Sequence, residues 1–208
     1  MELEQNKKRF EEEFSKIKRE GADALLDFIR QSDMYKAPCS TRFHLHVEGG
    51  LLQHSLNVLD ALRDLLCKKD DGTYAYRVAG LEVDAVTEEN VICMALLHDM
   101  CKVNLYNPVE KFRKDKNNNW EKYMGFEVKD KAPYGHGEKS VMMIEQFMQL
   151  QKKERYAIRW HMGFPEGEEK RTFTDAVKMY PIIWALHTAD MVATSFMEGD
   201  EENKELFR

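Results

Sequence analysis

Residues 91–102 read VICMALLHDMCK, and this segment gives the strongest indication of how the chain folds. At helical spacing, Val91 and Met94 share one side with His98, so a histidine falls on a face that should be core. Asp99 follows directly, and a carboxylate on a buried face costs several kcal/mol unless it is paired or binds a metal. Neighbours on a helix point about 100° apart, so His98 and Asp99 can approach one ion only from the helix end or across its edge.

Two further polar residues fall on predicted core faces. His54 shares an apolar stripe with Leu51 and Val58, and Asp190 lies in the apolar run of the last predicted helix. A single histidine on such a face is more often a hydrogen-bonded core residue, and a single buried aspartate could be the partner of a lysine or arginine. Together, the four residues supply two imidazoles and two carboxylates. That shell suits Mn, Fe, Co, Ni, Mg or Zn with water in the open positions.

Length and composition indicate one globular domain over 1–208. The 208 residues are 43% apolar and 33% charged, with a formal net charge of −6. The acidic balance makes a long nucleic acid an unfavourable partner. No apolar run reaches the roughly 18 residues of a membrane helix, and the charged N-terminus does not resemble a secretory signal. Because the four cysteines show no CxxC spacing, we expect reduced thiols in a cytoplasmic protein.

The apolar periodicity predicts an all-α fold, a helical bundle with one small inserted β-hairpin. Its core spans 43–197, a helix over 1–32 precedes it, and 198–208 should form a flexible acidic tail. The hairpin is expected within 103–134, which has seven bases and five acids and is positive in an acidic chain. The other expected elements are a loop over 33–48, a helix from Gly49 and Gly50, a turn or irregular excursion over 68–86 that holds Asp70-Asp71-Gly72, a helix from about Thr87, and helices over 137–151, 152–162 and 181–197.

Five motifs occur in order along residues 43–194, and together they resemble those of the HD superfamily of metal-dependent phosphohydrolases. The segment FHLHVEGGLLQH (43–54) is most similar to the HD domain of certain bacterial 3′–5′ exoribonucleases. The N-terminal nucleic-acid-binding domain of those enzymes has no counterpart in this sequence. The five motifs are GGLLQHS (49–55), LLHDMCK (96–102), GHGEKS (135–140), WHMG (160–163) and LHTADMVAT (186–194).

The resemblance implies a site for one or two divalent ions. Lys102 matches a lysine that meets a substrate phosphate. Cys101 replaces a glycine of the family pattern, and Trp160 replaces a second histidine, which leaves the second ion an open question. The implied ligands of the first ion are His54, His98, Asp99 and Asp190, while His136 and His161 match positions that complete a second site bridged by Asp99.

The function implied is hydrolysis of a phosphomonoester or phosphodiester in a nucleotide or short oligonucleotide. A divalent ion lowers the pKa of bound water and supplies hydroxide for attack on phosphorus. Lys102 would offset charge on the phosphoryl oxygens, and His136 or His161 could protonate the leaving oxygen. The alternative is a non-catalytic metal- or nucleotide-binding module with a regulatory role. The oligomeric state stays open.

Several other residues have two interpretations. His44 and His46 fit surface or supporting positions better than direct catalysis, and His187 fits a structural role. Cys101 could ligate a metal, but packing or a neutral substitution fits it better. In the hairpin, aromatic residues could stack a base and basic residues could admit a charged substrate, or both could be ordinary solvated hairpin positions. The aromatic residues are Trp120, Tyr123 and Phe126, beside Lys122 and Lys129, and the basic group is Lys111, Arg113, Lys114 and Lys116.

Overall fold

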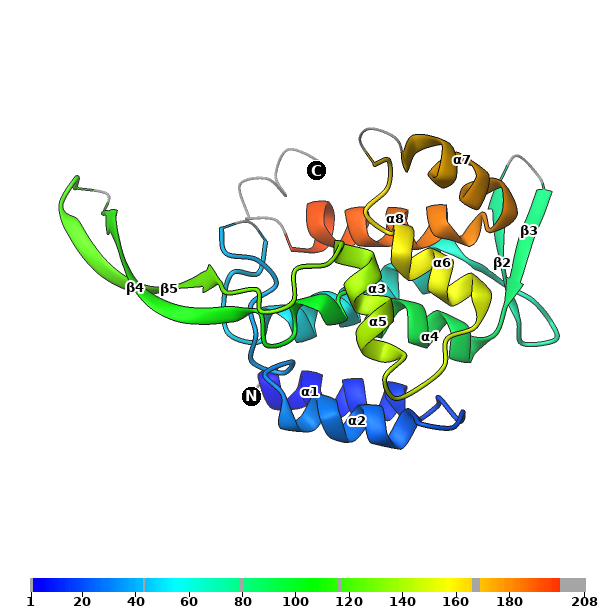
Figure 1. The fold of residues 1–208 in the computed structure, drawn as a ribbon, viewed down its shortest axis with the longest axis horizontal. Helices are drawn as coiled ribbons and strands as arrows, with labels where there is room; N and C mark the ends of the chain where they lie inside the picture. The colour runs from blue at the N-terminus through cyan, green and yellow to red at the C-terminus, as the bar shows by residue number, and fades with distance from the viewer. Residues whose placement is uncertain (1, 43, 79–80, 116, 166–168, 199–208) are drawn as a thin grey trace.

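The computed structural model describes residues 2–42, 44–78, 81–115, 117–165 and 169–198. Figure 1 shows a helical body from which one long β-ribbon projects. The mainly helical architecture predicted from sequence is therefore confirmed. The helices are α1 (Glu2–Phe14), α2 (Ala22–Gln31), α3 (Gly50–Leu65), α4 (Glu88–Leu97), α5 (His136–Ile144), α6 (Lys152–Trp160), α7 (Glu169–Met179) and α8 (Ile182–Val192).

Helix α3 packs against α1, α4 and α8. Leu52 and Leu56 of α3 are fully buried, and every residue of α4 from Val91 to Leu97 is buried as well. Each such leucine contributes roughly 1.5–3 kcal/mol of burial free energy. The predicted start of α4 is confirmed, because Asn90 N donates to Thr87 Oγ1 over 3.2 Å and Thr87 N donates to Asn90 Oδ1 over 3.0 Å. This packing fixes the C-terminal end of α4, where the polar cluster begins.

The single helix predicted over 1–32 is wrong, because α1 ends at Phe14 and α2 begins at Ala22. Gly21 has a φ of +85°, in the left-handed region that a helix cannot continue through. Arg30 of α2 donates to Glu11 of α1 over 2.6 Å, so the two helices are joined by an ion pair. Both halves carry helical periodicity, and periodicity alone did not reveal the turn between them.

Residues 68–86 are not an irregular excursion, and most of them belong to a three-stranded antiparallel sheet in the order β1 (Cys67–Lys68), β2 (Tyr74–Val78) and β3 (Leu81–Val86). The turn expected at Asp70-Asp71-Gly72 does connect β1 to β2, where Lys69 N donates to Thr73 O over 2.8 Å. Tyr74 and Val86 are paired in the register and buried. The fold class therefore gains a second small sheet beside the predicted hairpin.

The C-terminal half differs in its boundaries. Helix α5 ends at Ile144 rather than 151, whereas the predicted start of the next helix agrees with α6, which Gln151 N-caps in a reciprocal arrangement with Glu154. Helix α7 was not predicted. The last predicted helix, 181–197, is α8 followed by a π-helical segment at Ala193–Met197. Of the predicted flexible tail, residues 199–208 lie outside the described residues, whereas the side chain of Glu198 is buried.

The predicted hairpin is confirmed as β4 (Tyr106–Lys114) paired antiparallel with β5 (Trp120–Val128). At about 3.3 Å per residue, its far end lies about 26 Å from Tyr106, and Figure 1 shows it leading away from the body. Because side chains alternate between faces, Tyr123 lies opposite Trp120 and Phe126, so the three do not form one stacking surface. Lys116 of the predicted basic group lies outside the described residues.

No helix among the described residues is both long enough and apolar enough to cross a membrane.

Candidate metal centre

The six predicted ligands converge from five places in the fold. His54 lies in α3, His98 and Asp99 follow α4, and Asp190 lies in α8. The other two come from neighbouring helices, His136 as the first residue of α5 and His161 directly after α6. Helix packing thus brings together groups separated by up to 136 positions, the interval from His54 to Asp190 (190 − 54).

The contacts within the cluster are short, and Asp99 lies among the histidines. His136 Nε2 lies 2.7 Å from Asp99 Oδ1, and His161 Nε2 lies 3.6 Å from the same oxygen. His98 Nε2 lies 3.5 Å from Asp99 Oδ2. On the far side, His54 Nε2 lies 3.2 Å from His98 Nε2 and 3.3 Å from Asp190 Oδ1.

The second nitrogen of each of three histidines fixes the direction of its ring. His98 Nδ1 donates to Ala95 O over 2.9 Å, and His161 Nδ1 donates to Ile158 O over 2.7 Å. His54 Nδ1 lies 3.0 Å from a carboxylate oxygen of Glu198. A carbonyl or carboxylate only accepts, so Nδ1 carries the proton and Nε2 presents a lone pair in each neutral ring. This orientation is the usual one for histidines that bind a metal through Nε2.

In the neutral rings, three Nε2 lone pairs face the carboxylates of Asp99 and Asp190, and these groups repel one another unless a cation lies among them. Burial lowers the pKa of His54, but the charge of Cys39 and the hydrogen bond to Asp190 together outweigh burial and raise that pKa, so without a metal a proton on His54 supplies the positive charge. His161 Nε2 is buried and has no hydrogen-bond partner among the described residues. An unpartnered buried nitrogen is rare, and metal coordination is one of its few explanations. The residues present thus fit a bound divalent ion.

The donor geometry accommodates one ion or two. Among the predicted ligands and Cys101, ligand atoms within 4.8 Å of one another form three overlapping sets, with Asp99 common to two of them, and a fourth set, Cys39–His44–His54, shares His54. Cys101, interpreted from sequence as a packing residue, is buried but belongs to the third set, with its Sγ 3.3 Å from His136 Nδ1. The three sets are His54–His98–Asp190, His98–Asp99–His161 and Asp99–Cys101–His136.

Electrostatics keep the two carboxyls ionised. Burial raises the pKa of Asp99, but the Lys102 ammonium, 2.7 Å from Oδ2, and the surrounding histidines together outweigh burial and hold the pKa well below its usual range. Burial likewise raises the pKa of Asp190, but the hydrogen bond with His54 and the neighbouring imidazoles together lower it. Burial lowers the pKa of His161, which keeps that imidazole neutral.

One side of the cluster is open to solvent. The side chain of His136 is 35% exposed and that of Lys102 is 14% exposed, whereas His98 and His161 are fully buried. Burial lowers the pKa of His136, but the hydrogen bonds and charges of Asp99 and Cys101 together outweigh burial and raise that pKa to about 10. A substrate arriving from this side would meet a lysine and a protonated histidine.

Three residues around the cluster were not recognised as part of it from sequence. Cys39 Sγ lies 3.1 Å from His44 Nε2 and 3.3 Å from Lys102 Nζ. Burial raises the pKa of the Cys39 thiol, but the charge of His54 and hydrogen bonding to His44 outweigh it and bring the pKa to about 6. His44, assigned a surface or supporting position, lies with its ring centroid 5.2 Å from that of His54. Glu198 is the third.

The two remaining histidines lie outside the ligand set. His187 Nδ1 donates to His161 O over 2.7 Å, in agreement with a structural role. His46 is exposed. Trp160, at the position where the family pattern has a histidine, is buried against Phe173.

Compared with protein-family models, with curated proteins and with solved structures, the chain matches none.

Proposed function

We propose that this chain is an HD-superfamily phosphohydrolase that uses one or two divalent ions to hydrolyse a phosphate ester of a nucleotide or short oligonucleotide. The observation that carries the proposal is the convergence of three imidazole Nε2 atoms, two of them with Nδ1 bonded to backbone carbonyls, on a volume bordered by two carboxylates. The motif order LLHDMCK, GHGEKS, WHMG and LHTADMVAT supports the same conclusion.

A divalent ion in this cluster supplies the Lewis acidity that lowers the pKa of water and polarises a phosphoryl group. The chain's own groups account for the other requirements. Lys102 Nζ, beside Asp99 at the open side, is placed to contact a phosphoryl oxygen and offset its charge. His136, partly exposed, is placed to donate its proton to the leaving oxygen as the P–O bond breaks and the water oxygen bonds to phosphorus.

An enzyme is favoured over a purely structural metal site because of these same two residues. A structural site is typically closed by four ligands and buried. Here a lysine and a histidine accompany the ligands on the solvent side, in positions that a structural ion would not require.

The test combines metal content with turnover. Protein purified without chelator is analysed for bound elements and assayed on nucleotides, cyclic nucleotides and generic phosphodiesters with Mn, Mg, Co, Ni, Fe and Zn. Asp99→Ala should lose both metal and activity, Lys102→Ala should lose activity alone, and the exposed His46→Gln should lose neither. Metal bound without turnover of any substrate would support the alternative, a regulatory binding module. Undiminished metal binding by Asp99→Ala would show that the site is wrongly assigned.

A further inference from the structure

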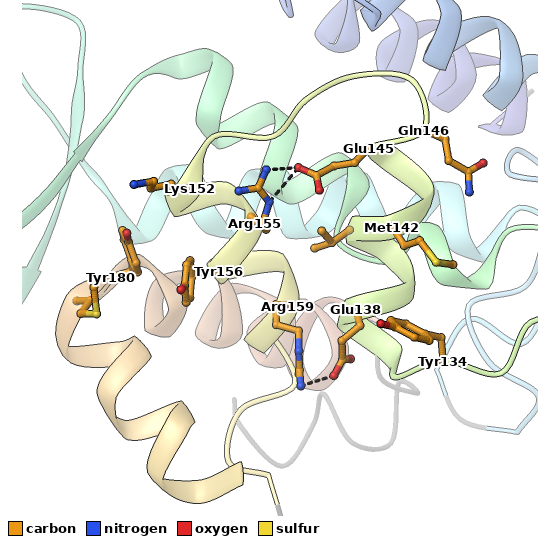
Figure 2. Close-up of a pocket in the computed structure, with 12 residues that line it drawn as sticks. Tyr134, Glu138, Met142, Glu145, Gln146, Lys152, Arg155, Tyr156, Arg159 and Tyr180 are labelled. Atoms are coloured by element: carbon orange, nitrogen blue, oxygen red, sulfur yellow. Dashed lines mark hydrogen bonds and ion pairs between the residues drawn. The ribbon is translucent and has the colours of Figure 1, made fainter.

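A second concave surface lies on the outer side of α5 and α6, where the end of α7 also reaches it (Figure 2). Its volume is about 770 Å³, within the 300–1,000 Å³ typical of small-molecule sites. None of the six predicted metal ligands lines it. This α5–α6 groove is therefore a candidate site separate from the metal centre.

One end of the α5–α6 groove is aromatic. The rings of Tyr156 and Tyr180 are stacked with centroids 4.5 Å apart and planes 27° apart. Val141 and Met142 of α5 and Met179 of α7 add apolar surface, of which Met179 is 64% exposed. Neither tyrosine hydroxyl has a hydrogen-bond partner among the described residues. A planar ring placed beside this pair would be held by stacking and apolar contact.

The same face of α6 is cationic. Lys152, Arg155 and Arg159 follow one another at helical spacing and line the groove together with Tyr156. Figure 2 shows both arginines paired with acids of the α5 side: Arg155 Nε donates to Glu145 Oε1 over 2.9 Å, and Arg159 contacts Glu138. Lys152 has no ion-pair partner among the described residues. Arg159 also donates to Glu169 over 3.0 Å, so both arginines are balanced by acids and Lys152 is the cation that attracts an anion to the groove.

We propose that the α5–α6 groove binds a nucleoside phosphate, with its base beside Tyr156 and Tyr180 and its phosphate between Lys152 and Arg155. The volume accommodates a small molecule, the tyrosine pair favours a flat ring, and the adjacent lysine and arginine favour an anionic oxygen group. A guanidinium can exchange a carboxylate for a phosphate without loss of hydrogen bonds, so Glu145 does not prevent binding.

The α5–α6 groove is connected to the metal centre through the helices that form it. α5 begins with His136, and His161 directly follows α6. At their closest approach, a Cβ on Gly137 would lie 2.2 Å from Arg159 O, so only glycine allows the two helices to meet there. The rings of His136 and His161 are consequently 5.1 Å apart. The ion pairs Arg155–Glu145 and Arg159–Glu138 join the helices, and a ligand that replaced the first of them would in this way alter the spacing of these histidines. The nucleotide thus regulates metal binding, a step that rests on the proposed function of the cluster.

Binding is measured calorimetrically on the full chain loaded with Mn²⁺, with AMP, adenosine, ribose 5-phosphate and inorganic phosphate as probes. AMP should bind more tightly than each of the three fragments, because it alone offers both a ring and a phosphate. Lys152→Glu and Tyr156→Leu should each weaken AMP binding by about tenfold or more. The matched control Lys170→Glu, on exposed α7 surface, carries the same charge change about 14 Å along the helix from Met179 and should bind normally.

Asp99→Ala separates this proposal from that of the metal centre. AMP affinity retained in Asp99→Ala but lost in Lys152→Glu places the nucleotide in the groove. Affinity lost only in Asp99→Ala, or unchanged in both groove variants, overturns the groove site and leaves the proposed hydrolase intact. Regulation is tested by titrating Mn²⁺ with and without AMP, because a nucleotide whose affinity depends on bound metal must change the metal affinity by the same factor. In wild type, AMP should shift the midpoint of the Mn²⁺ titration by threefold or more, and in Lys152→Glu it should not. Equal midpoints with and without AMP in wild type overturn the regulatory part.

Discussion

His54 and Glu198 are 144 positions apart, yet His54 Nδ1 donates to Glu198 Oε1 over 3.0 Å. Asn57, one turn along α3, donates to the same oxygen over 2.9 Å. The carboxylate is fully buried and thereby holds the His54 ring with Nε2 turned toward His98 and Asp190. Glu198 is a positioning residue for a metal ligand, since a carboxylate on the second nitrogen fixes the tautomer and raises ligand basicity.

Replacing this carboxylate should therefore weaken metal binding. Glu198→Ala is expected to bind Mn²⁺ about 10–100-fold more weakly than wild type, and Glu198→Gln, which keeps an acceptor oxygen, should lie between them. Competition against a chelator measures the affinities. Glu127→Ala, which removes an exposed carboxylate of β5, is the control. Wild-type affinity in a folded Glu198→Ala protein would refute the positioning role.

Metal removal should destabilise the fold, because the cluster directs lone pairs and carboxylates at one another. At free metal about 1,000-fold above Kd, binding adds about 4 kcal/mol to the free energy of unfolding. For a chain of this length that corresponds to roughly 8–16 °C in Tm. Thermal unfolding with metal and with EDTA measures the difference, and His98→Gln, lacking a ligand, should respond little to EDTA. Equal Tm values in wild type would argue against a resident ion.

Lys102 should matter for turnover and not for metal content. Loss of one preorganised positive group at a phosphoryl oxygen typically lowers kcat about 10²–10³-fold, which is the decrease expected of Lys102→Ala. Lys102→Arg should recover part of it, while the exposed Lys8→Ala should match wild type. Steady-state kinetics with elemental analysis of the same preparations decide the matter. Full activity in Lys102→Ala would remove the lysine from the mechanism.

The helical part of the cluster could be predicted because its residues interrupt apolar stripes. His54, His98 and Asp190 each occupy a position where a helix should be buried, and such an interruption is visible without a structure. Cys39 and His44 lie in the loop over 33–48, where no period exists to be interrupted. Glu198 follows the last helix among other acids, so the composition of this segment resembled that of a solvated tail.

The secondary-structure errors have a related cause. The strands within 67–86 are short and in part exposed, so the alternation of apolar and polar residues was too brief to be recognised in the sequence. The turn between β1 and β2 was nevertheless located. The apolar positions of α7 are too few to give a strong helical pattern, since only Phe173 and Ala176 are buried. Contacts made in the folded chain, and not local periodicity, determine these elements.

Acid should remove the stability contributed by the Glu13–Arg63 pair. Arg63 donates to the two Glu13 oxygens over 3.0 and 2.6 Å and lowers the pKa of Glu13 from 4.5 to about 2. A depressed carboxyl pKa stabilises the fold above the unfolded-state pKa, and this stability is lost as pH falls through the folded-state pKa. At about 1.4 kcal/mol per pKa unit, and discounted for solvent screening because the pair is partly exposed, it contributes about 1–2 kcal/mol at neutral pH.

Glu13→Gln should therefore reduce the free energy of unfolding at pH 7 by about this amount, and the difference from wild type should shrink between pH 4.5 and about 2. Urea unfolding across this pH range is the measurement, with the more exposed Glu12→Gln as the control. A difference that persists unchanged at the acid end would mean that Glu13 acts through packing and not through its charge.

The basic residues of the β4–β5 ribbon should have no effect on small substrates. From sequence, two interpretations of these residues were open: control of substrate entry, in which their removal raises KM for a charged nucleotide, and ordinary solvated positions of a hairpin. In the structure, Arg113 is paired with Glu121 and Lys111 Nζ donates to Phe126 O over 2.7 Å, so both cations are engaged within the ribbon. The far end is about 26 Å along the strand from Tyr106, roughly three Debye lengths at physiological salt. Replacing Lys111, Arg113 and Lys114 together by alanine should therefore leave KM for a mononucleotide within about twofold of wild type.

The triple variant with alanine at Lys8, Lys170 and Lys178 removes the same charge from exposed positions and serves as the control. A rise in KM confined to the ribbon variant, with metal content unchanged, would instead show that the ribbon folds over the metal centre during turnover.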